Sequence, residues 1–61
     1  MTPVEILQRH IRALEESGRS LREVARIARV SPGYLCNIKK GRSKRVSVET
    51  YNAVLAVMVL Q

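Results

Sequence analysis

The sequence predicts an all-α domain of four to five helices. Apolar residues recur at helical spacing along most of the chain, and Ser or Thr followed by Pro or Glu marks the start of successive helical segments. The 61 residues form one domain, spanning 1–61, whose core is built from Leu, Ile, Val and Ala, because only two Tyr and no Phe or Trp are present. A chain this short buries only about 60% of its unfolded surface, so we expect a partner to add stability.

The first helix is expected to begin after Thr2 and to end at Gly18. Thr2 can cap the helix, Pro3 suits its first position, and Glu5 completes a capping box. Gly18 supplies the left-handed residue that ends the helix. The apolar stripe of this helix consists of Val4, Leu7, Ile11 and Leu14.

The second helix is expected to begin at Ser20 and to end near Ala28. Ser20 caps it, and Glu23, three residues later, makes a second capping box. Its buried side is formed by Leu21, Val24, Ala25 and Ala28.

The third helix opens with Ser31 as its cap and Pro32 in its first turn, and it closes at Gly41. With the second helix it makes two short helices joined by a tight turn. The positions that point inward are Val24, Ala25, Ala28, Val30, Leu35 and Ile38. The positions that point outward are Arg22, Arg26, Arg29, Asn37, Lys39 and Lys40. A small apolar support that exposes a basic helix is typical of a helix-turn-helix DNA-binding unit.

A fourth helix is expected at 48–60, after a basic connector at 42–47. One apolar stripe consists of Val48, Tyr51, Leu55 and Met58, and further apolar residues surround the rest of the helix, so we expect it to be buried on nearly all sides. One side can meet the core while the other needs a partner, which predicts a symmetric homodimer. The predicted dimer interface consists of Tyr51, Val54, Leu55, Val57, Met58, Val59 and Leu60.

The net charge of +6 is concentrated in the middle of the chain. Residues 19–45 carry one acid, Glu23, and nine basic residues, whereas both flanks are close to neutral. This distribution favours a polyanionic partner, although an excess of basic residues can also serve solubility alone. The basic residues are Arg19, Arg22, Arg26, Arg29, Lys39, Lys40, Arg42, Lys44 and Arg45.

Several classes of protein are excluded by composition and motifs. A single cysteine, Cys36, allows neither an internal disulfide nor a cysteine-rich zinc site. The first residues lack the pattern of a signal peptide, and the apolar run 53–60 is too short to span a bilayer, so we expect a cytoplasmic, nucleoid-associated protein. His10 has no second metal ligand nearby, and no catalytic set of residues is present. We expect no enzyme activity, no cofactor, no small-molecule ligand and no membrane partner.

Residues 21–40 resemble the helix-turn-helix of the lambda-repressor-like superfamily, which includes phage repressors, Cro proteins and xenobiotic-response-element-like regulators. The resemblance extends over 20–58. Ala25 matches the small residue of the family's second helix, and the run 30–35 with Gly41-Arg42 is similar to the turn and recognition helix of the phage-type branch. The stretch 46–50 also resembles the lactose-repressor-type headpiece, but the full helix before residue 20 favours the phage-type arrangement.

Three positions depart from the family pattern. Arg29 stands where the family often has Gly in the turn, and a left-handed non-Gly residue costs on the order of 1 kcal/mol, which suggests a different turn or a compensating phosphate contact. Leu21 replaces a Gln that positions the backbone, and Lys39 replaces an acidic residue and so adds charge on the DNA side.

The resemblance implies that the third helix lies in the major groove of double-stranded DNA. Direct readout is expected to depend on Asn37, which can pair with adenine, and on Lys40, which can reach guanine, because Pro32 and Gly33 offer little hydrogen bonding. The positions near base edges are Pro32, Gly33, Cys36, Asn37 and Lys40. The expected phosphate contacts are Arg22, Arg26, Arg29, Ser31, Tyr34, Lys39, Arg42, Lys44 and Arg45.

Some of these positions have a second interpretation. Ser31 can act as a helix cap alone, and the Tyr34 ring can pack against the first or fourth helix instead of contacting phosphate. The arm 42–45 can follow the backbone, enter the minor groove, or form a solvated loop. Cys36 can be a redox-sensitive residue or a small neutral one.

The expected function is that of a sequence-specific transcription regulator, a repressor of phage or mobile-element origin that binds a palindromic operator as a homodimer. One alternative is a DNA-binding accessory protein, such as an excisionase-like architectural factor or an antitoxin. Another is a protein-interaction module that docks through the fourth helix.

Overall fold

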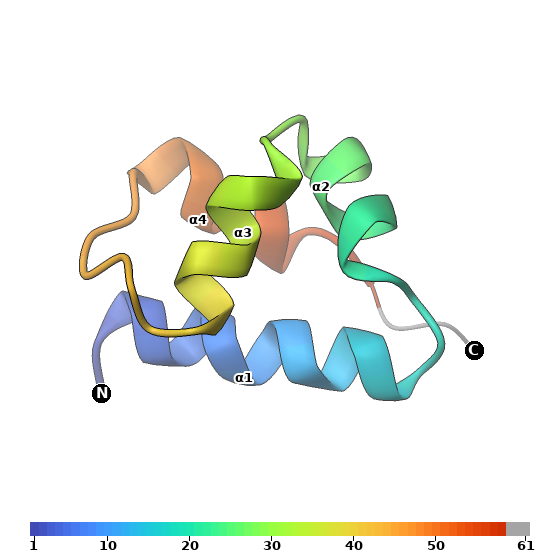
Figure 1. Ribbon diagram of the computed structural model, residues 1–61, viewed down its shortest axis with the longest axis horizontal. Coiled ribbons are helices and arrows are strands. Elements are labelled where there is room, and N and C mark those ends of the chain that lie inside the picture. Colours follow the sequence, from blue (N-terminus) through green and yellow to red (C-terminus); the bar gives the residue numbers. More distant parts are fainter. Residues whose placement is uncertain (59–61) are drawn as a thin grey trace.

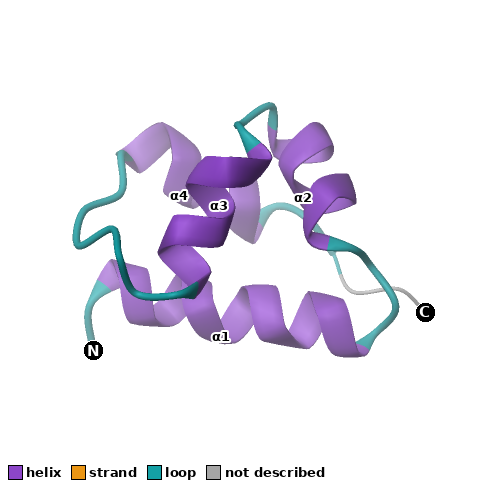
Figure 2. Cartoon of the chain, viewed as in Figure 1, coloured by secondary structure: helices purple, strands orange, loops and turns teal. Residues whose placement is uncertain are grey.

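The computed structural model describes residues 1–58 and contains four helices there, with no strand in that range (Figures 1 and 2). The helices are α1 (Pro3–Glu16), α2 (Leu21–Ala28), α3 (Pro32–Lys39) and α4 (Val48–Leu55). The longest helix, α1, runs along one side of the molecule and contacts each of the other three, while α2 also contacts α3 and α4 (Figure 1). The predicted all-α fold is therefore confirmed, with four helices where four to five were expected.

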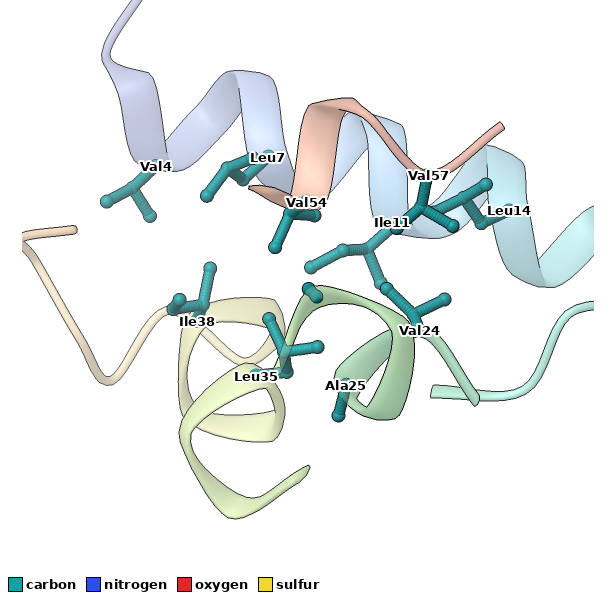
Figure 3. Close-up of a cluster of buried hydrophobic side chains, with 11 residues drawn as sticks. Val4, Leu7, Ile11, Leu14, Val24, Ala25, Leu35, Ile38, Val54 and Val57 are labelled. Atoms are coloured by element: carbon teal, nitrogen blue, oxygen red, sulfur yellow. The ribbon is translucent and has the colours of Figure 1, made fainter. Parts of the chain in front are cut away.

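One apolar cluster lies between α1 and the three shorter helices (Figure 3). All four residues of the α1 stripe are buried, as predicted, and seven of the eleven core residues come from the rest of the chain. The core consists of Val4, Leu7, Ile11, Leu14, Val24, Ala25, Ala28, Leu35, Ile38, Val54 and Val57.

The predicted capping box at the start of α1 is confirmed. The backbone N–H of Glu5 donates to Thr2 Oγ1 at 3.2 Å, and the backbone N–H of Thr2 donates to Glu5 Oε1 at 3.2 Å. The hydrogen bond from the Thr2 backbone N–H to the Glu5 carboxylate favours its ionised form and, with a further contribution from the Thr2 side chain, holds the pKa of Glu5 below its ordinary value.

The predicted box at the start of α2 is only half formed. Ser20 Oγ accepts from the backbone N–H of Glu23 at 3.1 Å, as expected for an N-cap. The Glu23 carboxylate does not complete the box but pairs with Arg19 Nη1 at 2.9 Å, because the guanidinium one turn earlier lies within reach.

The helices α1, α2 and α3 all end in the same way, with a left-handed residue followed by a backbone N–H that returns to the helix. The left-handed residues are Gly18 (φ 110°), Arg29 (φ 60°) and Gly41 (φ 80°). The returning hydrogen bonds define Schellman motifs and run from Arg19 to Leu14 (3.0 Å), from Val30 to Ala25 (2.9 Å) and from Arg42 to Asn37 (2.9 Å). Arg29 therefore adopts the conformation that the two glycines adopt elsewhere.

The prediction for the fourth helix was wrong in length and in register. It ends at Leu55, not at residue 60, and only the middle of the predicted stripe meets the core: Tyr51 and Leu55 pack against it, whereas Val48 and Met58 are 74% and 65% exposed. The buried positions are instead Thr50, Val54 and, beyond the helix, Val57.

Two side chains from outside α4 donate hydrogen bonds to carbonyl groups that follow its end. His10 Nε2 donates to the carbonyl oxygen of Val57 at 2.9 Å, and Arg19 Nε donates to that of Met58. Because these partners satisfy carbonyls that follow the helix, the chain can leave the helical path and turn Val57 into the core.

The predicted dimer interface is wrong in part. Val54 and Val57 are 0% and 3% exposed within a single chain, so neither can meet a partner. Tyr51 and Leu55 are half-buried against the same core, and Met58 is exposed. Val59 and Leu60 lie outside the described residues.

No helix within residues 1–58 combines the length and the apolar character needed to cross a bilayer.

Candidate nucleic-acid interface

The pair α2–α3 is held together by apolar residues and leaves one side of α3 open. Ala25, Ala28, Leu35 and Ile38 are buried, and Val30 in the link between the helices is half-buried, so the inward positions are as predicted. Gly33, Asn37 and Lys40, spaced four and three residues apart on α3 and its C-cap, are all exposed. All six predicted outward positions, Arg22, Arg26, Arg29, Asn37, Lys39 and Lys40, are exposed as well.

Side chains of α1 hold the C-terminal end of α3. Gln8 Nε2 donates to the carbonyl oxygen of Ile38 at 3.0 Å, and Lys39 Nζ lies 2.9 Å from the carboxylate of Glu15. Figure 1 shows this end of α3 above the N-terminal half of α1. The orientation of α3 is thus fixed from two sides, by α2 and by α1.

Ser31 occupies the N-cap position of α3 but makes no side-chain cap hydrogen bond, in contrast to the prediction. The backbone is already set for a helix start here, because Pro32 fixes its own φ and lacks an N–H. Both residues are exposed. The hydroxyl of Ser31 is therefore not committed to capping.

The remaining predicted base-reading position, Cys36, is half-buried rather than fully exposed, and its thiol is free. Tyr34, predicted to contact phosphate, is half-buried and packs against the core. Packing was the second interpretation of Tyr34 and agrees with this placement, while a contact of its hydroxyl with phosphate stays a prediction.

Basic side chains lie on both sides of α3. Arg22, Arg26 and Arg29 are exposed on α2 and on the residue that follows it, and Arg22 and Arg26 line a shallow depression with Ser20 and Glu23. The basic residues Arg42, Lys44 and Arg45 are exposed in the connector. Among the described residues none of these six forms a salt bridge, and neither does Lys40.

The connector is anchored at both ends. The backbone N–H groups of Arg42 and Ser43 donate to the carbonyl oxygen of Asn37 at 2.9 and 3.3 Å, and Ser43 Oγ donates to the carbonyl oxygen of Arg45 at 2.9 Å. At the other end, Val46 packs against the core. The charges of the connector are therefore held beside the C-terminal end of α3.

Lys39 and Arg19 differ from the other basic residues of the central segment because both are paired. Lys39 pairs with Glu15, and Arg19 pairs with Glu23 and with the Met58 carbonyl oxygen. Neither the pairing of Arg19 nor that of Glu15 was among the contacts predicted from the sequence. The spacing of residues in α1 could have indicated the contacts with α3. Gln8 and Glu15 each follow a residue of the buried α1 stripe and are seven residues apart, which places both on the same side of the helix.

Within residues 1–58, no group of three His, Cys, Asp or Glu side chains is placed to hold a metal ion, and every buried side-chain polar atom has a hydrogen-bond partner. Comparison of the chain with protein-family models, with curated proteins and with solved structures finds no match.

Proposed function

We propose that the chain binds double-stranded DNA in a sequence-specific way, with α2 and α3 acting as a helix-turn-helix and α3 entering the major groove. The observation that carries this proposal is the exposed side of α3, where Asn37 and Lys40 project between two groups of unpaired cations. Because a phosphate backbone runs along each side of the major groove, basic residues on both sides of the helix in the groove can contact phosphate.

Asn37 and Lys40 have the chemistry for direct readout. An Asn amide can both donate and accept towards adenine in the major groove, and a Lys ammonium can donate to the two acceptors of guanine. Pro32 and Gly33 add no hydrogen-bonding side chain but allow the α3 backbone to approach closely. The arm Arg42, Lys44 and Arg45 extends the phosphate contacts beyond the helix.

The biological role we propose is that of a transcription regulator in the cytoplasm, a repressor of the phage or mobile-element type acting as a homodimer on a palindromic operator. The resemblance of residues 20–58 to the lambda-repressor-like superfamily supports this role. Protein docking through α4 has less support, because Val54 and Val57 are buried in the chain's own core.

The experiment is selection of bound duplexes from random DNA, followed by affinity measurement on the selected site. We expect N37A/K40A to lose most of the affinity, since one good base contact contributes about 1–3 kcal/mol of discrimination. Both side chains are exposed, so the helix content of this variant, measured by circular dichroism, should equal that of the wild-type protein.

A matched control is R9A, which also removes one positive charge. Arg9 is exposed and lies on α1 opposite the buried stripe, so its loss should change affinity little. Equal losses in N37A/K40A and R9A would mean that only net charge matters, and would refute readout by α3. Failure to enrich any sequence, together with affinity that is the same for all duplexes, would favour an accessory DNA-binding role.

A further inference from the structure

Lys39 is held by a carboxylate from another helix. Its Nζ lies 2.9 Å from the carboxylate of Glu15, in the last turn of α1, and the two side chains are 45% and 31% exposed. The contact joins residues 24 positions apart, so it is a tertiary contact and not a neighbour effect within one helix.

The position of Glu15 is unfavourable for α1 itself. The C-terminal end of a helix carries a partial negative charge, which disfavours carboxylates there. The last turn of α1 contains Glu15 and Glu16 and no basic residue. Glu15 is compensated by Lys39, whereas Glu16 has no ion pair among the described residues.

Lys39 is also the exception among the cations at and just after the C-terminal end of α3. Its neighbour Lys40 and the cations Arg42, Lys44 and Arg45 have no carboxylate partner in residues 1–58. A phosphate can approach these four without displacing a protein group, whereas at Lys39 it must replace the Glu15 carboxylate.

We infer that Glu15 competes with DNA phosphate for Lys39 and so lowers the affinity of the protein for DNA. This inference rests on the proposed function. The carboxylate acts in two ways: it occupies the ammonium, and its own negative charge repels an approaching phosphate within about a Debye length. Glu15 is thus a residue that sets affinity without contacting DNA.

The test compares E15Q with E16Q. Both variants raise the net charge by one and both remove a carboxylate from the last turn of α1, but only E15Q frees Lys39. Binding is measured by fluorescence anisotropy on one random-sequence duplex of about 30 base pairs, between about 50 and 200 mM salt. We expect E15Q to bind about two- to fivefold more tightly than E16Q, with a log K against log salt slope steeper by about 0.9 per bound chain.

A double-mutant cycle with K39Q adds a second measurement. In the wild-type background K39Q leaves the Glu15 carboxylate unpaired and should lower affinity slightly, and in the E15Q background it should return affinity to about the wild-type value. Thermal unfolding of each variant shows whether the fold is retained; both glutamates lie at the surface, so we expect midpoints close to that of the wild-type protein.

Three results would overturn the inference: equal gains in E15Q and E16Q, a loss of affinity in E15Q, or a gain in E15Q that survives K39Q. The second result would mean that the pair serves to position α3. If the wild-type protein did not bind the duplex at any salt concentration, the proposed function itself would be refuted. That outcome is distinct from the three results above, each of which requires DNA binding.

Discussion

Arg29 is the only residue other than glycine with a positive φ in the part of the chain that the structure describes. It ends α2 with the hydrogen-bonding pattern that Gly18 and Gly41 support at the ends of α1 and α3. From the sequence alone, an arginine where the family often has Gly suggested either a different turn or a compensating phosphate contact. The observed φ of 60° and ψ of 41° are left-handed, so Arg29 forms the same kind of turn that a glycine would form and its backbone is strained.

Replacement of Arg29 by glycine should therefore stabilise the fold and weaken DNA binding. Relief of the left-handed conformation contributes on the order of 1 kcal/mol to the free energy of unfolding, which corresponds to about 4–8 °C in a domain of this size. Loss of one phosphate contact should make the salt slope shallower by about 0.9 per chain. Thermal denaturation and salt-dependent anisotropy measure the two effects.

Two further substitutions separate these effects at Arg29. R29A keeps the strain and removes the charge, so it should lose affinity without becoming more stable. R29K keeps both the strain and the charge and should resemble the wild-type protein. If R29G gained stability and kept full affinity, the proposed phosphate contact of Arg29 would be wrong.

At the scale of elements, local signals in the sequence predicted α1, α2 and α3 well. Thr2 with Glu5, Ser20, and the left-handed Gly18 and Gly41 act on residues within one or two turns, so their effect can be read from spacing alone. The path of the chain after α4 could not be predicted in this way, because its carbonyl groups accept from His10 and Arg19, which are 47 and 39 positions away from their acceptors.

The same distinction applies to the candidate interface. The outward positions of α2 and α3 follow from helical spacing and were correct, whereas the pairing of Lys39 with Glu15 requires α1 to be packed against α3. The half-burial of Cys36 and Tyr34 likewise depends on neighbours that spacing within one helix does not show.

The observed register of α4 predicts that a Val→Ala substitution lowers stability at one position of the helix but not at another. V54A removes two methyl groups from a fully buried side chain and should lower the free energy of unfolding by about 2 kcal/mol. V48A, in the same helix but 74% exposed, should change it by less than about 0.5 kcal/mol. Chemical denaturation of both variants checks this. An equal decrease in the free energy of unfolding at the two positions would instead support the register predicted from the sequence, in which Val48 is buried.

At the scale of the whole molecule, the acids are concentrated on α1, where Arg9 and Arg12 nearly balance them, and the excess positive charge lies elsewhere. Three of the five acids, Glu5, Glu15 and Glu16, lie on α1, and the unpaired cations of the central segment lie on α2, at its end, and at and after the end of α3. This distribution of charge creates a positive electrostatic potential at the exposed side of α3, which attracts a polyanion. Because the salt dependence of binding reports the number of phosphates neutralised, it also indicates how many chains bind.

A single chain that neutralises about four phosphates should give a log K against log salt slope near −3.6, and a homodimer on one site should give a slope near −7. Half-sites about one helical turn apart in the selected duplexes would agree with the steeper value, because the two α3 helices of a symmetric dimer then meet successive major grooves. A slope near −3.6 on a single half-site would contradict the dimer and retain DNA binding. A slope shallower than about −2 would remove the electrostatic basis of the proposed function, since four unpaired cations beside α3 should release more counterions than that.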